Sequence, residues 1–428
     1  MSNALERAEA AFQQGNWSSL HQRLQQLLVD RTTELSDSTT ARLLELAIAV
    51  LEAGDFQDRW DIAKLLPAFG DRAIAPLLAL LQDDEADLEA RWFTARILGS
   101  YSHPDVVRAL MNLLQTTSSE ELSSIAAESL ATLGTAAIAA LTDLIAQDNT
   151  RLFAVRSLAH IRHSETIAPL LTVVTDPDPS VRAVALRALG SFHDPRVLSA
   201  LVDALYDEQA TVRQAAVEEL GFCNDLTLQL DLVQLLSNRL QDVHSAVCSE
   251  AAIALGRLGT DAAADALFAV LQSPQTPKPL QLELVWSLAR IGSTIALEYL
   301  QQALSLFNQP ASMSLYQAMI VAVGRWETVD CKPQAAQILI AALDTSLATE
   351  QPTLRQTIAI GLGALGQLTA LETLIQLLAD EEMSVRLHAI AALKALDAQT
   401  AHQQLQRLAH SDLPDALKRG VAIAIREW

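Results

Sequence analysis

The chain has 428 residues and carries 51 acidic against 30 basic side chains, which gives a formal net charge of −21. Half of the residues are hydrophobic and 4% are aromatic, a composition too apolar for an intrinsically disordered chain. The length allows roughly two to four globular domains or one long repeat array. The negative charge argues against nucleic acids and anionic membrane surfaces as partners, because both require a surface of Lys and Arg.

Cysteine use and the lack of long apolar runs indicate a compartment. Three cysteines form neither a CxxC pair nor an even set, as is typical of a reducing cytosol. Residues 1–30 lack the apolar core of a signal peptide, and no run approaches the roughly 18 apolar residues of a membrane-spanning helix. We therefore expect a cytoplasmic protein with no membrane insertion.

The chain divides into two terminal segments and a central array of repeats. Residues 1–57 show helical hairpin patterns without the repeat and are expected to form an N-terminal helical cap. Over residues 58–400 a phrase of the form L-x-x-[LIFW]-G, or a close variant, recurs every 28 to 39 residues, with its large apolar residue at positions 69, 98, 133, 161, 189, 220, 258, 291, 326, 365 and 396. Residues 401–428 are expected to form a C-terminal capping helix, because terminal repeats must shield the ends of a continuous core.

Each repeat is predicted to contain two helices, and the second is clearest over residues 178–190. Asp178 favours an N-cap, Pro179 suits the first helical position, and Gly190 is expected to end the helix in a left-handed conformation. The preceding helix carries the pattern of residues 167–171, which recurs at 74–78.

Small residues recur four positions before the large apolar residue of the phrase. This column contains Leu65, Thr94, Ser129, Ser157, Ala185, Ala216, Ala254, Ser287, Ala322, Gly361 and Ala392. Small residues at one helical position let neighbouring helices approach near the lower end of the usual 8–10 Å. The pattern predicts an α-solenoid and explains a chain rich in Ala and Leu but poor in aromatic residues.

The motif D-x-x-V-R…A-L-G of residues 178–190 and the segment H-D-P-R-V at 193–197 resemble the HEAT-repeat superfamily, in its short phycobilisome-lyase-like form. Residues 103–107 and 381–386 repeat parts of both. The resemblance implies an all-α, right-handed α-solenoid of about eleven helix pairs with helical caps. It also implies that the second helices form the concave row.

Five arginines occupy one equivalent position early in the second helices: Arg91, Arg182, Arg213, Arg355 and Arg386. Acids precede three of them by four residues, at Asp87, Asp178 and Glu382. The family resemblance implies that such an acid and arginine link adjacent repeats in a structural ladder.

A second column, immediately before the large apolar residue, holds arginine in three successive repeats, at Arg257, Arg290 and Arg325. Equivalent positions of stacked repeats recur about 10 Å apart, so these side chains should form a line. Trp286, Trp326 and Tyr316 are predicted to accompany them. One interpretation is a groove that binds carboxylates of a partner or the propionates of a tetrapyrrole. The alternative is that each arginine pairs with an acid such as Glu250 or Glu283.

Other motifs are interpreted as structural. Residues 361–366 match GxGxxG, but they lie at the end of a predicted second helix and lack the βαβ context of a dinucleotide site. His160, His163 and His193 lack ligand spacing and accompanying cysteines, so we expect surface histidines and no metal site. Cys248 lies among small residues of a second helix and is predicted to be a core thiol. Proline-bearing connections after Gly221 are the loops most suited to function.

The sequence supports two functions. The first is a non-catalytic protein–protein interaction scaffold or assembly factor without a cofactor, because solenoids present extended binding surfaces and no nucleophile–base set is present. The resemblance implies that its partner could be a phycobiliprotein or a photosynthetic assembly subunit. The alternative, also implied by the resemblance, is a lyase that attaches or detaches a bilin such as phycocyanobilin at a phycobiliprotein cysteine. No catalytic residue can be assigned from the sequence.

Overall fold

The computed structural model describes residues 2–29, 36–192, 194–223 and 231–428. Throughout these residues the regular structure is helical, with no strand. The chain divides between Ala204 and Leu205 into two compact units, which are described separately. The expected all-α repeat architecture is therefore confirmed. The cap boundaries expected at residues 57 and 400 fall inside helices, within Phe56–Ala63 and Met383–Ala409.

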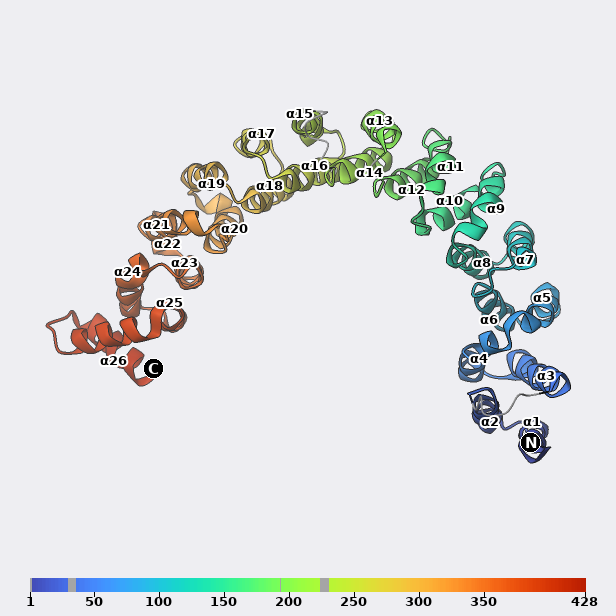
Figure 1. Ribbon diagram of the computed structural model, residues 1–428. Coiled ribbons are helices and arrows are strands. Elements are labelled where there is room, and N and C mark those ends of the chain that lie inside the picture. The colour runs from blue at the N-terminus through green and yellow to red at the C-terminus, as the bar shows by residue number, and fades with distance from the viewer. Residues whose placement is uncertain (1, 30–35, 193, 224–230) are drawn as a thin grey trace. The chain divides into compact units, whose positions relative to one another are not determined.

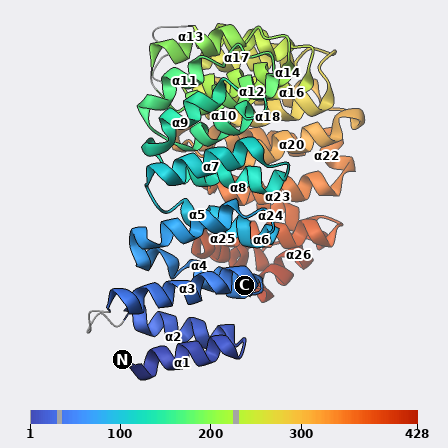
Figure 2. The same ribbon diagram turned by 90° about the vertical axis from the view of Figure 1, so that its right-hand side faces the viewer.

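The first unit alternates between two rows of helices, stacked one after another as Figure 2 shows. The first helices of successive pairs are α1 (Ser2–Gln13), α3 (Asp37–Ala53), α5 (Ile74–Gln82), α7 (Pro104–Thr116), α9 (Thr135–Ile145), α11 (Ile167–Leu171) and α13 (Pro195–Ala204). The second helices are α2 (Trp17–Val29), α4 (Phe56–Ala63), α6 (Leu88–Leu98), α8 (Glu120–Thr132), α10 (Arg151–His160) and α12 (Pro179–Leu189). Short 3-10 turns at Leu66–Ala73 and Ser164–Thr166 precede α5 and α11.

The second unit has the same plan. Its first helices are α15 (Leu232–Ser237), α17 (Asp261–Leu271), α19 (Thr294–Leu306), α21 (Lys332–Leu343) and α24 (Leu371–Gln376). Its second helices are α14 (Ala210–Leu220), α16 (Ser245–Leu258), α18 (Lys278–Ile291), α20 (Met313–Gly324), α23 (Pro352–Leu365) and α25 (Met383–Ala409). The short α22 (Ser346–Glu350) precedes α23, and α26 (Asp415–Arg426) follows α25. Within this unit the second helices line the inner side of the curve (Figure 1).

The start of α12 follows the sequence prediction, but its end does not. Asp178 accepts a hydrogen bond from the Ser180 backbone N–H at 2.8 Å, and Pro179 is the first helical residue. Gly190 has φ −56°, so the left-handed end predicted there is wrong. Left-handed glycines instead end α16, α18 and α23, at Gly259, Gly292 and Gly366.

The repeat phrase therefore combines two registers one helical turn apart. In α6 and α14 the glycine of the phrase directly follows the completely buried Leu98 and Leu220. In α16, α18 and α23 it lies four residues after the equivalent completely buried leucines, Leu255, Leu288 and Leu362. The first copy, at residues 66–70, does not end a second helix at all, because it forms the 3-10 turn after α4. The structural equivalents of Leu220 are Leu255, Leu288, Val323, Leu362 and Leu393.

Small residues hold consecutive second helices in close contact. A Cβ added at Gly221 would lie 2.7 Å from Ala254 Cβ, and one added at Gly324 would lie 2.7 Å from Gly361 Cα. The same relation joins Gly99 to Ser129, Gly256 to Ser287, and Gly363 to Ala392. Except for Leu65, which is partly exposed between α4 and the following turn, the small-residue column predicted from the sequence is buried. The close packing expected from that column is thus present.

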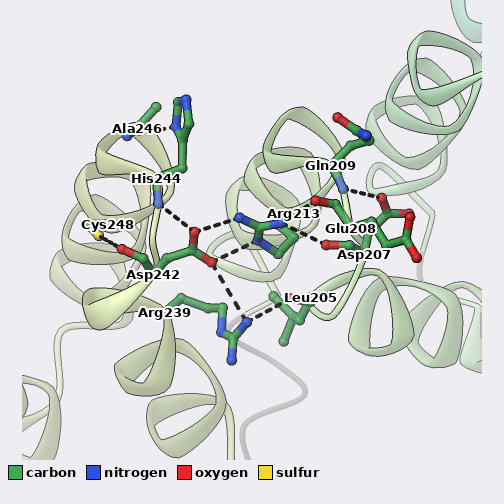
Figure 3. A network of polar contacts seen from close by, with 10 residues as sticks. All are labelled: Leu205, Asp207, Glu208, Gln209, Arg213, Arg239, Asp242, His244, Ala246 and Cys248. Atoms are coloured by element: carbon green, nitrogen blue, oxygen red, sulfur yellow. Dashed lines mark hydrogen bonds and ion pairs between the residues drawn. The ribbon is translucent and has the colours of Figure 1, made fainter.

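An arginine ladder also links adjacent repeats (Figure 3). Arg213 of α14 donates to both carboxylate oxygens of Asp242, at 2.8 and 2.7 Å, and to the carbonyls of Asp207 and Glu208. Arg355 contacts Asp380 in the same two-pronged way, at 2.6 and 3.0 Å. In the first unit, Arg59 pairs with Asp87 at 2.6 Å and Arg151 with Asp176 at 3.3 Å. The predicted ladder is therefore present at Arg213 and Arg355. Arg91, in contrast, pairs with Asp84, and Arg386 donates to the carbonyls of Asp380 and Glu381, in each case in the turn before the arginine's own helix.

The ladder acid is the expected one in the pair of Arg59 with Asp87, which lies four residues before Arg91, but it differs in the other three pairs. Asp242 and Asp380 lie in the turn six residues before the fourth position of the next second helix, not four residues before it. Asp178, at the expected place, caps α12. In α16 that fourth position holds Cys248, whose Sγ donates to the Asp242 carbonyl at 3.1 Å (Figure 3). Cys248 thus makes the backbone hydrogen bond that Arg386 makes at the same position of α25. A thiol cannot also form the ion pair to the next repeat that a ladder arginine forms.

Within the described residues no single helix is long and apolar enough to cross a bilayer. The bent pair Phe56–Ala63 and Leu66–Gln82 together reaches the necessary length and apolar composition, and nothing more is shown of it.

Gly324→Ala tests the close helix contact. Alanine normally stabilises a helix interior by about 1 kcal/mol relative to glycine. Here the new Cβ would lie within 2.7 Å of Gly361 backbone, so we expect a lower thermal midpoint, measured by circular dichroism. The exposed substitution Ala364→Ser on α23 is the control and should move the midpoint little. A higher midpoint for Gly324→Ala would contradict the packing argument.

Asp242→Asn tests the ladder. Burial would raise the pKa of the Asp242 carboxyl, but hydrogen bonds from Arg213 and the His244 backbone, with the charges of Arg213 and Arg239, lower it below its usual value. A carboxyl with a lowered folded pKa stabilises the protein above its unfolded pKa of about 3.9, and this contribution disappears as the pH falls through the folded value.

We expect Asp242→Asn to cost about 3–5 kcal/mol at neutral pH, because it leaves the buried Arg213 without its counter-charge. As the pH is lowered from neutral into the acid range, the free energy of unfolding measured in urea should also decrease less for the variant than for the wild type. Asp105→Asn, which removes an exposed pair with Arg108, should cost less than about 1 kcal/mol. Equal effects of the two substitutions would refute a special role for the ladder.

Candidate functional site

The three arginines of the predicted line occupy equivalent places in the second unit. Arg257, Arg290 and Arg325 each lie two residues after a completely buried aliphatic residue at the same structural position, namely Leu255, Leu288 and Val323. The structural register assigns the same place in the preceding repeat to Phe222, which follows Leu220 by two residues. Counting back one residue from the large apolar residue at position 220 of the phrase gives Glu219 instead, because the phrase does not reveal the shift of one turn.

Phe222 and Arg257 are in direct contact. The Phe222 ring is 59% exposed, and the Arg257 guanidinium carbon lies 4.3 Å from its centre. Arg257 also pairs with Glu250 at 3.4 Å, with a quarter of its side chain exposed. The ion-pair interpretation therefore holds for this arginine. A stacked and paired guanidinium is fixed in orientation, which favours structural use over free binding.

Glu250 is the acid of this cluster. Burial, and then the nearby charge of Glu218, raise the pKa of the Glu250 carboxyl, while Arg257 acts in the opposite direction. Arg257 thus offsets part of the cost of holding a carboxylate between α14, α16 and α18.

Arg290 and Arg325 behave differently from Arg257. Both are exposed, and within the described residues neither side chain makes a hydrogen bond or an ion pair, so pairing with Glu283 is not observed. Trp286 lies one turn before Arg290 on α18 and is 38% exposed. The equivalent position on α23 is Ile360, with 49% of its surface exposed. This part of the second-helix row therefore offers two unpaired cations beside exposed apolar side chains.

Two predicted aromatic residues lie in the core instead of on this face. Tyr316 is 1% exposed, with its hydroxyl 3.5 Å from Thr345 Oγ1, and Trp326 is 3% exposed. Neither ring can contact a partner, so the aromatic company of the arginines reduces to Trp286 and Phe222. The sequence contained the signal for Tyr316: it shares helical spacing with the buried Met319, Ile320 and Val323.

A groove of about 700 Å³ lies where the ladder is interrupted. It runs between the starts of α16 and α18 and is lined by Val243, Cys248, Thr276 and Pro277, among others. Burial raises the pKa of the Cys248 thiol, and the residue is 6% exposed, so the predicted core thiol is confirmed. The proline-bearing connection after Ser273 forms one wall of the groove.

The remaining motifs have structural roles where the structure describes them. Gly361 and Gly363 lie inside α23 against the neighbouring helices, and Gly366 ends α23 in a left-handed conformation, so GxGxxG serves helix packing. His163 Nδ1 accepts a hydrogen bond from the Glu165 backbone N–H. His193 lies outside the described residues. Across the described ranges, no three His, Cys, Asp or Glu side chains gather in a metal-binding arrangement.

Comparison with family models identifies the repeats. The model described as HEAT repeats matches residues 74–152, 146–221, 207–278 and 339–426, which is more than half of the chain. The chain is a HEAT-repeat protein. A second model, described as a PBS lyase HEAT-like repeat, matches residues 280–305. The resemblance inferred from residues 178–190 is thereby confirmed.

Solved structures with a similar fold include large HEAT-like proteins. A crystal structure of importin beta has a TM-score of 0.54 and 12% identity, over 97% of this chain and 63% of that one. Kap121p bound to RanGTP has a TM-score of 0.58 and 14% identity, over 91% of this chain and 48% of that one. The HEAT-repeat chain thus spans about half to two thirds of the length of these proteins, and the likeness concerns the fold alone. A comparison with curated protein sequences found no match.

Proposed function

We propose that this HEAT-repeat protein is a non-catalytic interaction scaffold or assembly factor that binds another protein along the second helices of its second unit. The observation that carries the proposal is the pair of exposed arginines without acid partners, Arg290 and Arg325, beside the exposed ring of Trp286. Arginine and tryptophan are the residue types that contribute most to binding energy at protein interfaces.

The chemistry of this face favours an anionic segment of the partner. A guanidinium binds a carboxylate with two parallel hydrogen bonds, which suits recognition of Asp, Glu or a propionate. The whole chain carries a net charge of −21, so its other surfaces would repel such a partner and the arginines also provide specificity. On the sequence argument from unpaired cysteines, we place this function in the cytoplasm.

A pigment-bearing partner is the finer version of the proposal. The PBS lyase HEAT-like match covers residues 280–305, and this segment contains Trp286 and Arg290. A phycobiliprotein or a photosynthetic assembly subunit would then be the partner, and a bilin lyase activity is the second candidate function. In that case Arg290 and Arg325 would hold the propionates of the bilin, while the acceptor protein supplies the cysteine nucleophile.

The double variant Arg290→Gln, Arg325→Gln tests the scaffold. We expect it to fold normally, because both side chains are exposed. Its affinity for the proteins that the wild type captures from a phycobilisome-containing lysate should be at least about tenfold lower. Arg72→Gln with Arg108→Gln, two exposed arginines of the first unit, removes the same charge as a control. Identical captured proteins and affinities for both double variants would contradict the proposal. Captured proteins without pigment would leave the scaffold and exclude the phycobiliprotein version.

Phycocyanobilin tests the second candidate directly. If the protein binds the bilin at this face, mixing should shift and strengthen the visible absorption band, and Arg290→Ala should reduce the change. An unchanged spectrum, or a change that Arg290→Ala does not affect, would exclude the bilin lyase interpretation.

A further inference from the structure

The first unit carries an aromatic and cationic patch on the second helices α4 and α6. It consists of Phe56, Trp60, Trp92 and Arg96, and we call it the α4–α6 patch. The rings of Phe56 and Trp60 stack with centres 6.3 Å apart, and both pack edge-on against Phe93 below them. Trp92 also contacts Phe93, with ring centres 5.2 Å apart.

Arg96 lies between the two indoles. Its guanidinium carbon is 4.5 Å from the centre of the Trp60 ring and 5.6 Å from that of Trp92. The side chain is exposed, and within the described residues it makes no hydrogen bond or ion pair. The indoles hold the guanidinium in place, while its N–H groups keep their full capacity to donate.

The patch is a surface and not part of the core. Phe56 is 54% exposed, and Trp60 and Trp92 are partly exposed, whereas Phe93 beneath them is completely buried. Trp60 and Trp92 come from consecutive repeats, so the close stacking of α4 and α6 creates the patch. A second cation, Lys64, lies 5.7 Å from the Trp60 ring and pairs with Asp61.

We propose that the α4–α6 patch binds an acidic, apolar segment of a partner protein. A carboxylate of the segment would accept two hydrogen bonds from Arg96, and a neighbouring aliphatic side chain would lie on Phe56 and Trp60. Charge complementarity selects this occupant: the patch presents an unpaired arginine with aromatic walls, and a partner carboxylate there replaces no existing ion pair. A nucleic acid would need a row of Lys and Arg to neutralise successive phosphates, whereas the patch offers Arg96 and Lys64, and Lys64 already pairs with Asp61.

This site is separate from the proposed binding face of the second unit. It uses residues of α4 and α6, and no residue of α16, α18 or α20 contributes to it. The proposal for one surface can therefore be refuted without affecting the proposal for the other.

A defined peptide pair tests the patch. One fluorescein-labelled peptide alternates Glu and Leu, and its match alternates Gln and Leu. Fluorescence anisotropy with the full chain should show at least about tenfold tighter binding of the Glu peptide. Arg96→Gln should abolish that preference, Trp60→Ala should weaken binding of both peptides, and Arg96→Lys should restore only part of the preference, because lysine lacks the planar two-pronged geometry.

Arg108→Gln is the matched control, since it removes one exposed arginine of the first unit that belongs to neither proposed binding surface. It should leave both affinities unchanged, and circular dichroism should show all variants folded. The proposal is overturned if the Glu peptide fails to bind at roughly millimolar concentration. Equal losses from Arg96→Gln and Arg108→Gln, or Arg96-dependent binding of a single-stranded oligonucleotide in place of the peptide, would overturn it as well.

Discussion

Direct contact between small residues of consecutive second helices is the constraint on which each unit of this protein depends. At Gly221 and Ala254, or at Gly324 and Gly361, there is no room for even one additional methyl group. Packing this close sets the distance between neighbouring repeats and explains why a half-hydrophobic chain contains so few aromatic residues. The buried rungs from Arg213 to Asp242 and from Arg355 to Asp380 then fix the same repeats at the start of the helices.

This packing determines what the exposed surface of the second helices can present. Once the repeats are in register, side chains at one helical position form a row, and its chemistry changes along the chain. Arg257 stacks on Phe222 and pairs with Glu250, whereas the side chains of Arg290 and Arg325 form no ion pair within the described residues. In the first unit the same stacking brings Trp60 and Trp92 to either side of Arg96. Both surfaces follow from adjacent repeats and not from any single helix.

The sequence predicts the repeats better than their registers. The cap at Asp178, the buried small-residue column and the shared position of the ladder arginines could all be predicted, because each depends on helical spacing. The phrase could not separate Gly221 from Gly259, since a glycine needed for close packing and one needed for a left-handed helix end are the same residue type. For the same reason Phe222 was missed. The ladder acid depends on the path of a turn, which spacing along the chain does not specify.

The distance between residues 257 and 325 tests most directly whether close packing holds the repeats of the second unit in register. Spin labels at these two positions, introduced independently of the native cysteines and read by pulsed electron resonance, should give one narrow distribution near roughly 20 Å, which is two helix spacings. The same distribution should persist at low and high salt, because the contact is steric and not electrostatic. A broad distribution, or a maximum that moves with salt, would contradict a fixed line of arginines.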